Sequence, residues 1–228
     1  MEMMTKAISL AEIEDPPFDV RGTLFFLEGH YLFRYRADGG IHTKFVTPKD
    51  LAAAFSKSEL DTGWMPAGIV RAGDCAKGPY YVYTAPAQKV KVVLDLKDGE
   101  AVTIPIPRTV LMGIGSAFYL WAMKNEHFEA DSGAFQAPFP NVYLGGKICW
   151  GANSPGQAEV KQARQTWELF FASPFNQDLS GNKSLEQRQD VRVMLRKLVD
   201  KNKYPLGDLM DYNATIGYMV EEILRKRN

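Results

Sequence analysis

The sequence predicts an α+β fold in which the strands come first and the helices last. Between residues 22 and 123, short apolar runs are separated by turns rich in Gly and Pro, which is typical of antiparallel strands. From residue 154 onward, apolar side chains recur at intervals of three and four, which is typical of helices that bury one face. Because the two kinds of element are segregated along the chain, their order favours α+β over repeated βαβ units.

The strands are predicted as short runs bounded by turn residues. The first two runs flank Gly29, as in a hairpin. Thr47 as N-cap, with Pro48 at the first helical position, predicts a short helix that extends over 50–56. The run at 118–123 is continuously apolar, which predicts a central strand. The predicted strands are 23–27, 31–35, 41–46, 80–84, 89–94, 101–106 and 118–123.

The last third of the chain predicts three helices, which follow a loop at 133–151. Ser154-Pro155 is a typical helix start, and Ser184 with Gln187 resembles a capping box at the start of the second helix. The predicted helices are 154–172, 184–201 and 212–226.

The strand-rich and helix-rich parts suggest a division of the chain. Residues 59–78 are rich in Gly and separate the first strands from the rest. We therefore expect residues 1–78 to form a β-rich N-terminal extension or subdomain and residues 79–228 to form the core. One continuous domain over 1–228 is the alternative, since this length fits one large domain.

The composition argues against several functional classes. The 27 basic residues are balanced by 27 acidic ones, which gives no electrostatic reason to expect nucleic acid or an anionic membrane. The cysteines, Cys75 and Cys149, form no disulfide framework, so we expect a reducing cytoplasm. The acidic start, broken by Pro16-Pro17, is unlike a signal peptide, and no apolar run approaches the length of a membrane span. No cysteine has a histidine at metal-ligand spacing and the GxG at 113–115 lacks a third glycine, so we expect no metal or cofactor.

The most informative segment is 139–150, in which Asn141 and Cys149 are joined by a turn that contains two glycines. A cysteine thiolate attacks thioesters and is also a good leaving group. A side-chain amide can donate a hydrogen bond to the oxyanion that forms. Since Gly145 and Gly146 would let the chain double back, we expect the amide and the thiol to meet at one reacting carbonyl. This pair fits a transferase that stores an acyl group.

Other interpretations of these residues stay open. A lone cysteine is often an ordinary buried residue, and Asn141 alone is typical of a turn. A cysteine-dependent hydrolase would need a histidine within hydrogen-bonding reach of Cys149. The candidates are His30, His42 and His127, and none of them lies in the same segment.

The string Pro140-Asn141-Val142-Tyr143-x-x-Gly146-x-Ile148-Cys149 resembles the active-site signature of ubiquitin-conjugating enzymes. The strings at 137–143, 148–151 and 170–176 are similar to the prokaryotic branch of that superfamily, and closest to the PRTRC system protein B family. The resemblance implies an antiparallel β meander, an active-site loop and C-terminal helices, with an extended β-rich N-terminal region. Phe139 stands where the wider family has a histidine of mainly structural role.

The resemblance also implies roles and partners. Cys149 would carry a ubiquitin-like protein as a thioester, Asn141 would support the oxyanion, and Asp178 would orient the incoming amine. Tyr143 and Trp150 are expected to be packing residues, although flanking aromatic side chains could also shield the thioester from water. The implied partners are a ThiF-type activating enzyme, a ubiquitin-like protein and a JAB-type peptidase, encoded together on mobile elements. The alternative is a catalytically inactive scaffold of the same fold, although the retained cysteine and asparagine favour the enzyme.

Overall fold

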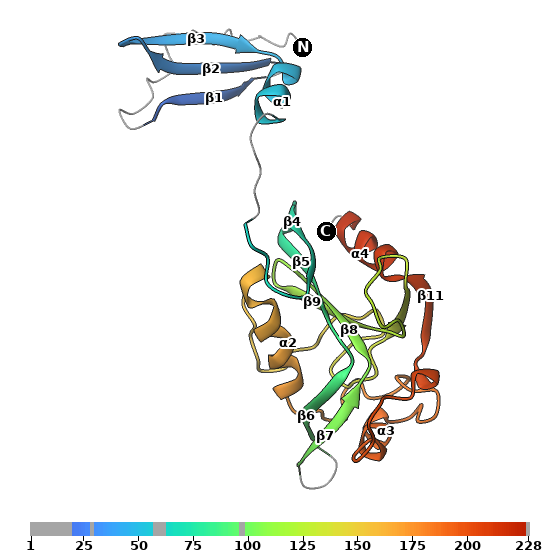
Figure 1. Ribbon diagram of the computed structural model, residues 1–228. Helices are drawn as coiled ribbons and strands as arrows, with labels where there is room; N and C mark the ends of the chain where they lie inside the picture. Colours follow the sequence, from blue (N-terminus) through green and yellow to red (C-terminus); the bar gives the residue numbers. More distant parts are fainter. Residues whose placement is uncertain (1–19, 28–29, 57–62, 96–98, 227–228) are drawn as a thin grey trace, which may run out of the picture. The chain divides into compact units, whose positions relative to one another are not determined.

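The chain divides into two compact units in the computed structural model (Figure 1). Unit 1 is Met1–Gly63 and unit 2 is Trp64–Asn228. The described residues form antiparallel sheets and four α-helices, so the predicted α+β class is confirmed. The residues that the structure describes are 20–27, 30–56, 63–95 and 99–226.

Unit 1 contains a three-stranded antiparallel sheet followed by a short helix. α1 (Pro48–Ser56) begins after Thr47, whose hydroxyl accepts a hydrogen bond from the Asp50 amide at 3.1 Å, so the predicted N-cap is confirmed. The predicted turn at Gly29 lies outside the described residues. The strands pair in chain order, and they are β1 (Gly22–Leu27), β2 (His30–Ala37) and β3 (Gly40–Val46).

Unit 2 contains a six-stranded antiparallel sheet and a separate two-stranded ladder. Its described strands are β4 (Ile69–Cys75), β5 (Gly78–Ala85), β6 (Gln88–Leu94), β7 (Glu100–Ile106), β8 (Arg108–Ile114), β9 (Ala117–Met123), β10 (Gly133–Gln136) and β11 (Asp211–Thr215). The sheet has the order β11-β10-β9-β8-β5-β4, and β6 pairs with β7 alone (Figure 1). β9 lies inside the sheet, as its continuous apolar run predicted.

The division between the units lies earlier than the sequence suggested. β4 falls within residues 1–78, which we expected to belong to the N-terminal extension. It pairs with β5 from Arg71 to Cys75 and so forms one edge of the unit 2 sheet. This hairpin pairing with β5 assigns β4 to unit 2, which begins at Trp64.

The helices of unit 2 are shorter than predicted: α2 (Ala163–Ala172), α3 (Val191–Lys197) and α4 (Ile216–Arg225). The first predicted helix, 154–172, begins late because the chain before it follows another path. Gly156 adopts a φ of 78°, and the Ala158 amide donates to the Gly115 carbonyl at 2.7 Å. Only the 3-10 turn η2 (Val160–Gln162) precedes α2.

The second predicted helix, 184–201, is replaced at its start by a side-chain network. The Ser184 hydroxyl accepts from the Gln187 amide at 2.8 Å, as in a capping box, but it also donates to the buried Asp208 carboxylate at 2.8 Å. Asp190 caps α3 instead, because its carboxylate accepts from the Arg192 amide at 3.0 Å.

The start of the third predicted helix, 212–226, is a strand. Residues 212–215 lie in β11, which pairs with β10. The Thr215 hydroxyl then caps α4 by accepting from the Tyr218 amide at 3.1 Å. Because the partner strand lies far away in sequence, apolar spacing alone gave no sign of β11.

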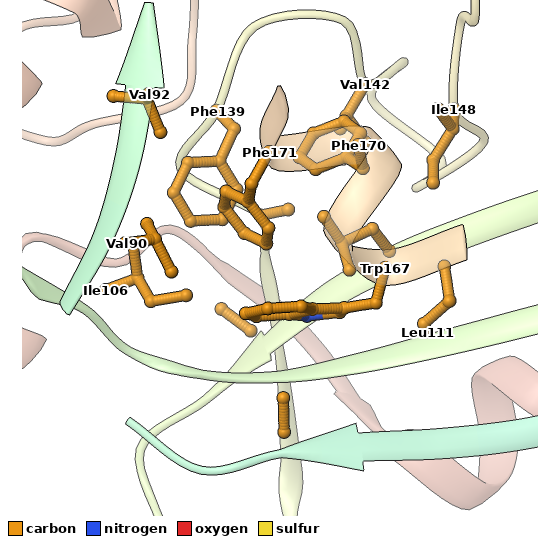
Figure 2. Packing of buried hydrophobic residues seen from close by; sticks show 14 of the residues in the cluster. Val90, Val92, Ile106, Leu111, Phe139, Val142, Ile148, Trp167, Phe170 and Phe171 are labelled. Atoms are coloured by element: carbon orange, nitrogen blue, oxygen red, sulfur yellow. The ribbon is translucent and has the colours of Figure 1, made fainter. Parts of the chain in front are cut away.

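The six-stranded sheet is buried on both faces. On one face, Ile216, Val220 and Ile223 of α4 pack against apolar side chains of β5, β8 and β9. On the other face, α2 and the β6–β7 ladder enclose a cluster of aromatic rings (Figure 2). Among the described residues, no helix is both long and apolar enough to cross a membrane.

Phe139 lies within this aromatic cluster, beside Phe171 (Figure 2). Its fully buried ring contacts Phe170, Phe171 and Phe175 at centroid separations of 6.1, 5.1 and 6.0 Å. A histidine at this position would bury a polar ring among three rings that offer it no hydrogen-bond partner. The phenylalanine therefore keeps the packing role of the position with a side chain that suits its surroundings.

Candidate active site

The segment from Asn141 to Cys149 forms a tight hairpin whose ends meet. The Cys149 amide donates to the Asn141 carbonyl at 2.7 Å, and the Tyr143 amide donates to the Lys147 carbonyl at 2.8 Å. The Gly146 amide donates to the Tyr143 carbonyl at 2.8 Å and closes the turn. The structure therefore brings Asn141 and Cys149, the two main residues of the predicted site, next to each other.

The turn depends on Gly146. Its φ of 89° lies in the left-handed region, and a Cβ at this position would lie 2.3 Å from the indole nitrogen of Trp121. At Gly145, a Cβ would meet no heavy atom within 4 Å beyond its neighbours in the chain. Of the two glycines expected to let the chain double back, only Gly146 is required by the geometry.

The hairpin is fixed to the first half of β9. The Leu120 amide donates to the Gly146 carbonyl, and the Ile148 amide donates to the Phe118 carbonyl, both at 2.8 Å. Val142 and Ile148 pair with each other and bury their side chains in the aromatic core (Figure 2). The central sheet therefore determines where the hairpin lies.

The residues beside this buried pair face outward, because side chains alternate along extended backbone. Tyr143 is 47% exposed, Lys147 is exposed and Cys149 is half-buried. A hydrogen bond between the Tyr143 hydroxyl and Cys149 raises the pKa of the tyrosine. The packing role that we expected for Tyr143 is wrong, and its two-residue spacing from Asn141 is the sequence signal that could have placed it at the site. Trp150 does pack, edge-on against two rings of the core.

Asn141 also holds a second loop against the hairpin. Its Nδ2 donates to the Pro174 carbonyl at 2.9 Å, and its backbone amide donates to the Asp178 carbonyl at 3.4 Å. A side-chain amide has two N–H hydrogens, and the bond to Pro174 uses one of them. Within the described parts of the chain, no acceptor binds the second hydrogen. An oxyanion-binding role for Asn141 stays a prediction.

Asp178 is brought to the site by this loop. Its backbone contacts Asn141, and its exposed carboxylate accepts from Asn176 Nδ2 at 3.1 Å. Asn176 Oδ1 in turn accepts from the Asp178 amide at 2.9 Å, which fixes the turn. The structure thus places the Asp178 backbone next to Asn141, and its role toward an amine stays a prediction.

A buried lysine supports the hairpin from the core side. Lys183 is 1% exposed, and its Nζ donates to the Val142 carbonyl. With its amide oxygen turned toward Lys183, Gln136 accepts a second bond from Nζ at 2.8 Å and donates to the Asn182 carbonyl at 2.9 Å. Burial lowers the pKa of Lys183 to about 8. Sequence analysis missed this residue, because nothing around it distinguishes a buried lysine from an exposed one.

The structure gives no support to a cysteine-dependent hydrolase. The single histidine of unit 2, His127, follows the end of β9, whereas the hairpin is bonded to the start of that strand. A strand of this length extends roughly 20 Å. His30 and His42 lie in unit 1. In the described residues, no group of three or more His, Cys, Asp or Glu side chains is arranged to hold a metal ion.

Comparison of the sequence with models of known protein families gives one match that includes the hairpin. The model of prokaryotic E2 family D matches residues 45–212, which is more than half of the chain and includes Asn141, Cys149 and Asp178. The chain belongs to this family. The resemblance to prokaryotic ubiquitin-conjugating-like proteins is thereby confirmed, and membership implies a ubiquitin-like protein and an activating enzyme as the general kinds of partner. Comparison with curated proteins and with solved structures gave no match.

Replacing Gly146 with Ala should destabilise this family D protein, because the new methyl group would collide with Trp121 while the backbone keeps a positive φ. We expect urea denaturation to show a loss of about 2–4 kcal/mol in the free energy of unfolding. Gly145→Ala is the matched control, and its change should stay within about 0.5 kcal/mol. Equal losses in the two variants would contradict the assignment of the turn to Gly146.

Replacing Lys183 with Met should flatten the dependence of stability on pH above pH 8. The pKa of Lys183 is 10.5 in an unfolded chain and about 8 in the folded protein, so the unfolded state binds more protons between these values. Wild-type stability should therefore rise across this window, by up to roughly 3 kcal/mol. Urea denaturation at intervals of about one pH unit measures the rise. The control Lys161→Met, at an exposed position, should keep the rise in stability with pH. A rise of wild-type size in Lys183→Met would contradict the prediction.

Proposed function

We propose that this protein accepts a ubiquitin-like protein as a thioester on Cys149 and transfers it to an amine. The observation that supports the proposal most directly is the hairpin. It sets a half-buried thiol beside an asparagine whose side-chain amide retains a free hydrogen, on a scaffold matched by an E2 family. A buried structural cysteine would need neither the exposed face nor the tyrosine contact.

In the charging step, the Cys149 thiolate attacks the thioester carbonyl by which the activating enzyme holds the ubiquitin-like protein. A carbon–sulfur bond to Cys149 forms as the bond to the activating enzyme breaks, and that enzyme's thiolate leaves. The Tyr143 hydroxyl, whose pKa Cys149 raises, donates its hydrogen to the sulfur while the sulfur is negatively charged. Lys147 on the same outward face contributes a positive charge near the attacking sulfur.

In the transfer step, an amine attacks the Cys149 thioester and forms a tetrahedral oxyanion. The second side-chain N–H of Asn141 donates to this oxygen, an interaction that is worth about 3 kcal/mol in comparable sites. The amine loses its proton to solvent water, an amide bond forms, and the Cys149 thiolate leaves. Asp178, held beside Asn141 by the backbone contact, orients the incoming amine.

We further propose that the protein is of the PRTRC system protein B type, with a ThiF-type activating enzyme and a JAB-type peptidase as its other partners. The supporting strings are 137–143, 148–151 and 170–176, and the third is separated in sequence from the first two but adjacent to them in the fold. The first two form the ends of the hairpin, and the third supplies Phe170, Phe171 and Phe175 that pack on Phe139. The similar residues thus make up the site and its immediate support.

The direct test mixes the protein with its ubiquitin-like partner, the activating enzyme and ATP. We expect an adduct that reductant removes in the wild type, a reductant-resistant oxyester or no adduct in Cys149→Ser, and no adduct in Cys149→Ala. Cys75→Ser is the matched control, because Cys75 is the other free thiol, and it should charge like the wild type. The measurement is non-reducing electrophoresis. A thioester that persists in Cys149→Ala would sink the assignment, and its absence in wild type would favour the inactive scaffold.

Replacing Asn141 with Ala should separate the two steps. Charging needs only the nucleophile, so its extent should stay close to that of the wild type. Discharge to a free amine should slow by about a hundredfold, because the oxyanion loses a donor. Asn153→Ala is the control, since this exposed asparagine bonds to Ser173 instead. Single-turnover discharge measures the effect; equal losses in charging and discharge would indicate a merely structural role for Asn141.

A further inference from the structure

A cleft of about 670 Å³ lies at the far end of the unit 2 sheet from Cys149. Its lining comes from the start of β6, the end of β7, the start of β8, the end of β9 and the loop at 202–206. The Asn141–Cys149 hairpin is bonded to the start of β9, and this strand extends roughly 20 Å. The cleft is therefore a separate feature that the proposed transfer reaction does not use.

The cleft carries an excess of positive charge. Four cationic side chains line it against the single carboxylate of Glu126. None of the four takes part in an ion pair between described residues. Glu126 acts electrostatically on Arg108 and offsets part of this charge, and Lys124 Nζ lies 4.3 Å from the centre of the Phe135 ring, so a net positive charge remains in the cleft. The four residues are Lys89, Arg108, Lys124 and Lys203.

Hydrogen bonds fix the two walls of the cleft. Lys89 Nζ donates to Asn202 Oδ1 at 3.3 Å, which ties β6 to the loop at 202–206. Arg108 donates from Nη1 to Thr84 Oγ1 at 3.0 Å and from Nη2 to the Glu126 carbonyl, which ties β8 to the segment after β9. Arg108 Nε is buried without a partner, and partial burial lowers the pKa of this arginine. An anion in the cleft would offset that cost.

The floor of the cleft is apolar. Pro105, Ile106, Pro107 and Met123 line it and are buried. The prolines have no N–H, whereas phosphate sites in proteins commonly draw on backbone N–H groups at helix starts or nests. Carboxylates held by ammonium and guanidinium groups, with an apolar group on the floor, fit this lining better than a phosphate does.

We propose that this cleft binds an acidic peptide segment of a partner protein, whose carboxylates pair with the cationic walls and whose apolar side chain rests on the floor. Charge complementarity carries the assignment, because the walls offer four cations and one anion. The volume suits a short stretch of extended chain rather than a folded surface. The proposal goes beyond thioester transfer and does not depend on Cys149.

The test uses the full chain and a fluorescent synthetic peptide of alternating Glu and Leu, with binding followed by anisotropy. We expect binding that weakens as salt is raised, and a loss of at least about tenfold in affinity for the double variant Lys124→Glu, Lys203→Glu. Both lysines are exposed, so the fold should not change. The matched control is Lys161→Glu, Lys226→Glu, two exposed lysines outside the cleft, which should bind like the wild type.

Three outcomes would overturn the proposal: equal affinity in the cleft and control variants, equal binding of a peptide in which Gln replaces Glu, or no binding of the acidic peptide. Inorganic pyrophosphate is a further arm. If it binds in a manner that depends on Lys124 and Lys203 while the peptide does not, the cleft is a phosphate site and the peptide assignment fails. Cys149→Ser should bind the peptide like the wild type, which keeps this result distinct from that of the charging assay.

Discussion

Two backbone hydrogen bonds join the Asn141–Cys149 hairpin to β9, and every other feature of the site depends on this attachment. β9 lies inside a sheet that is buried on both faces, so displacing it would open both cores. Pairing of Val142 with Ile148 then turns their neighbours outward and sets Tyr143 against Cys149. A cysteine positioned in this way keeps its geometry without support from a bound ligand, as the proposed nucleophilic role requires.

Lys183 is buried because the N–H donors of its ammonium group can satisfy more than one buried acceptor. The Val142 carbonyl faces the core, where a polar group without a partner costs about 1–3 kcal/mol. An ammonium offers three donors, and Lys183 uses two of them to join the hairpin to Gln136 on β10. An apolar side chain of similar length would fill the space and leave both acceptors unpaired. The hydrogen bonds of this one cation thus hold two segments together. The free-energy cost of removing the cation from water is reflected in its lowered pKa.

The sequence predicted those features that depend on local pattern and missed those that depend on distant partners. The central position of β9, the Thr47 cap and the turn between Asn141 and Cys149 could be predicted from the sequence. β8 could not, because Pro107 precedes it, Gly113 interrupts its apolar pattern, and its partner β5 lies more than twenty residues earlier in the chain. The predicted helix over 184–201 satisfied apolar spacing, but the buried Asp208 binds Ser184 and holds the chain in another path. Burial of a charged residue such as Lys183 is likewise decided by tertiary contacts alone.

Two sites at opposite ends of one strand impose a limit on any molecule that uses both. Cys149, the proposed nucleophile, lies beside the start of β9 and the cationic cleft lies at its end, roughly 20 Å away along the strand. Extended chain covers about 3.5 Å per residue, so a peptide anchored in the cleft needs at least about six residues to bring an amine of the same molecule to Cys149. A partner with a shorter spacer could occupy the cleft but not accept the acyl group. If both proposals hold, recognition by charge and reaction at the thiol are separable in this fold, and the length of chain between them decides which acceptors can use both.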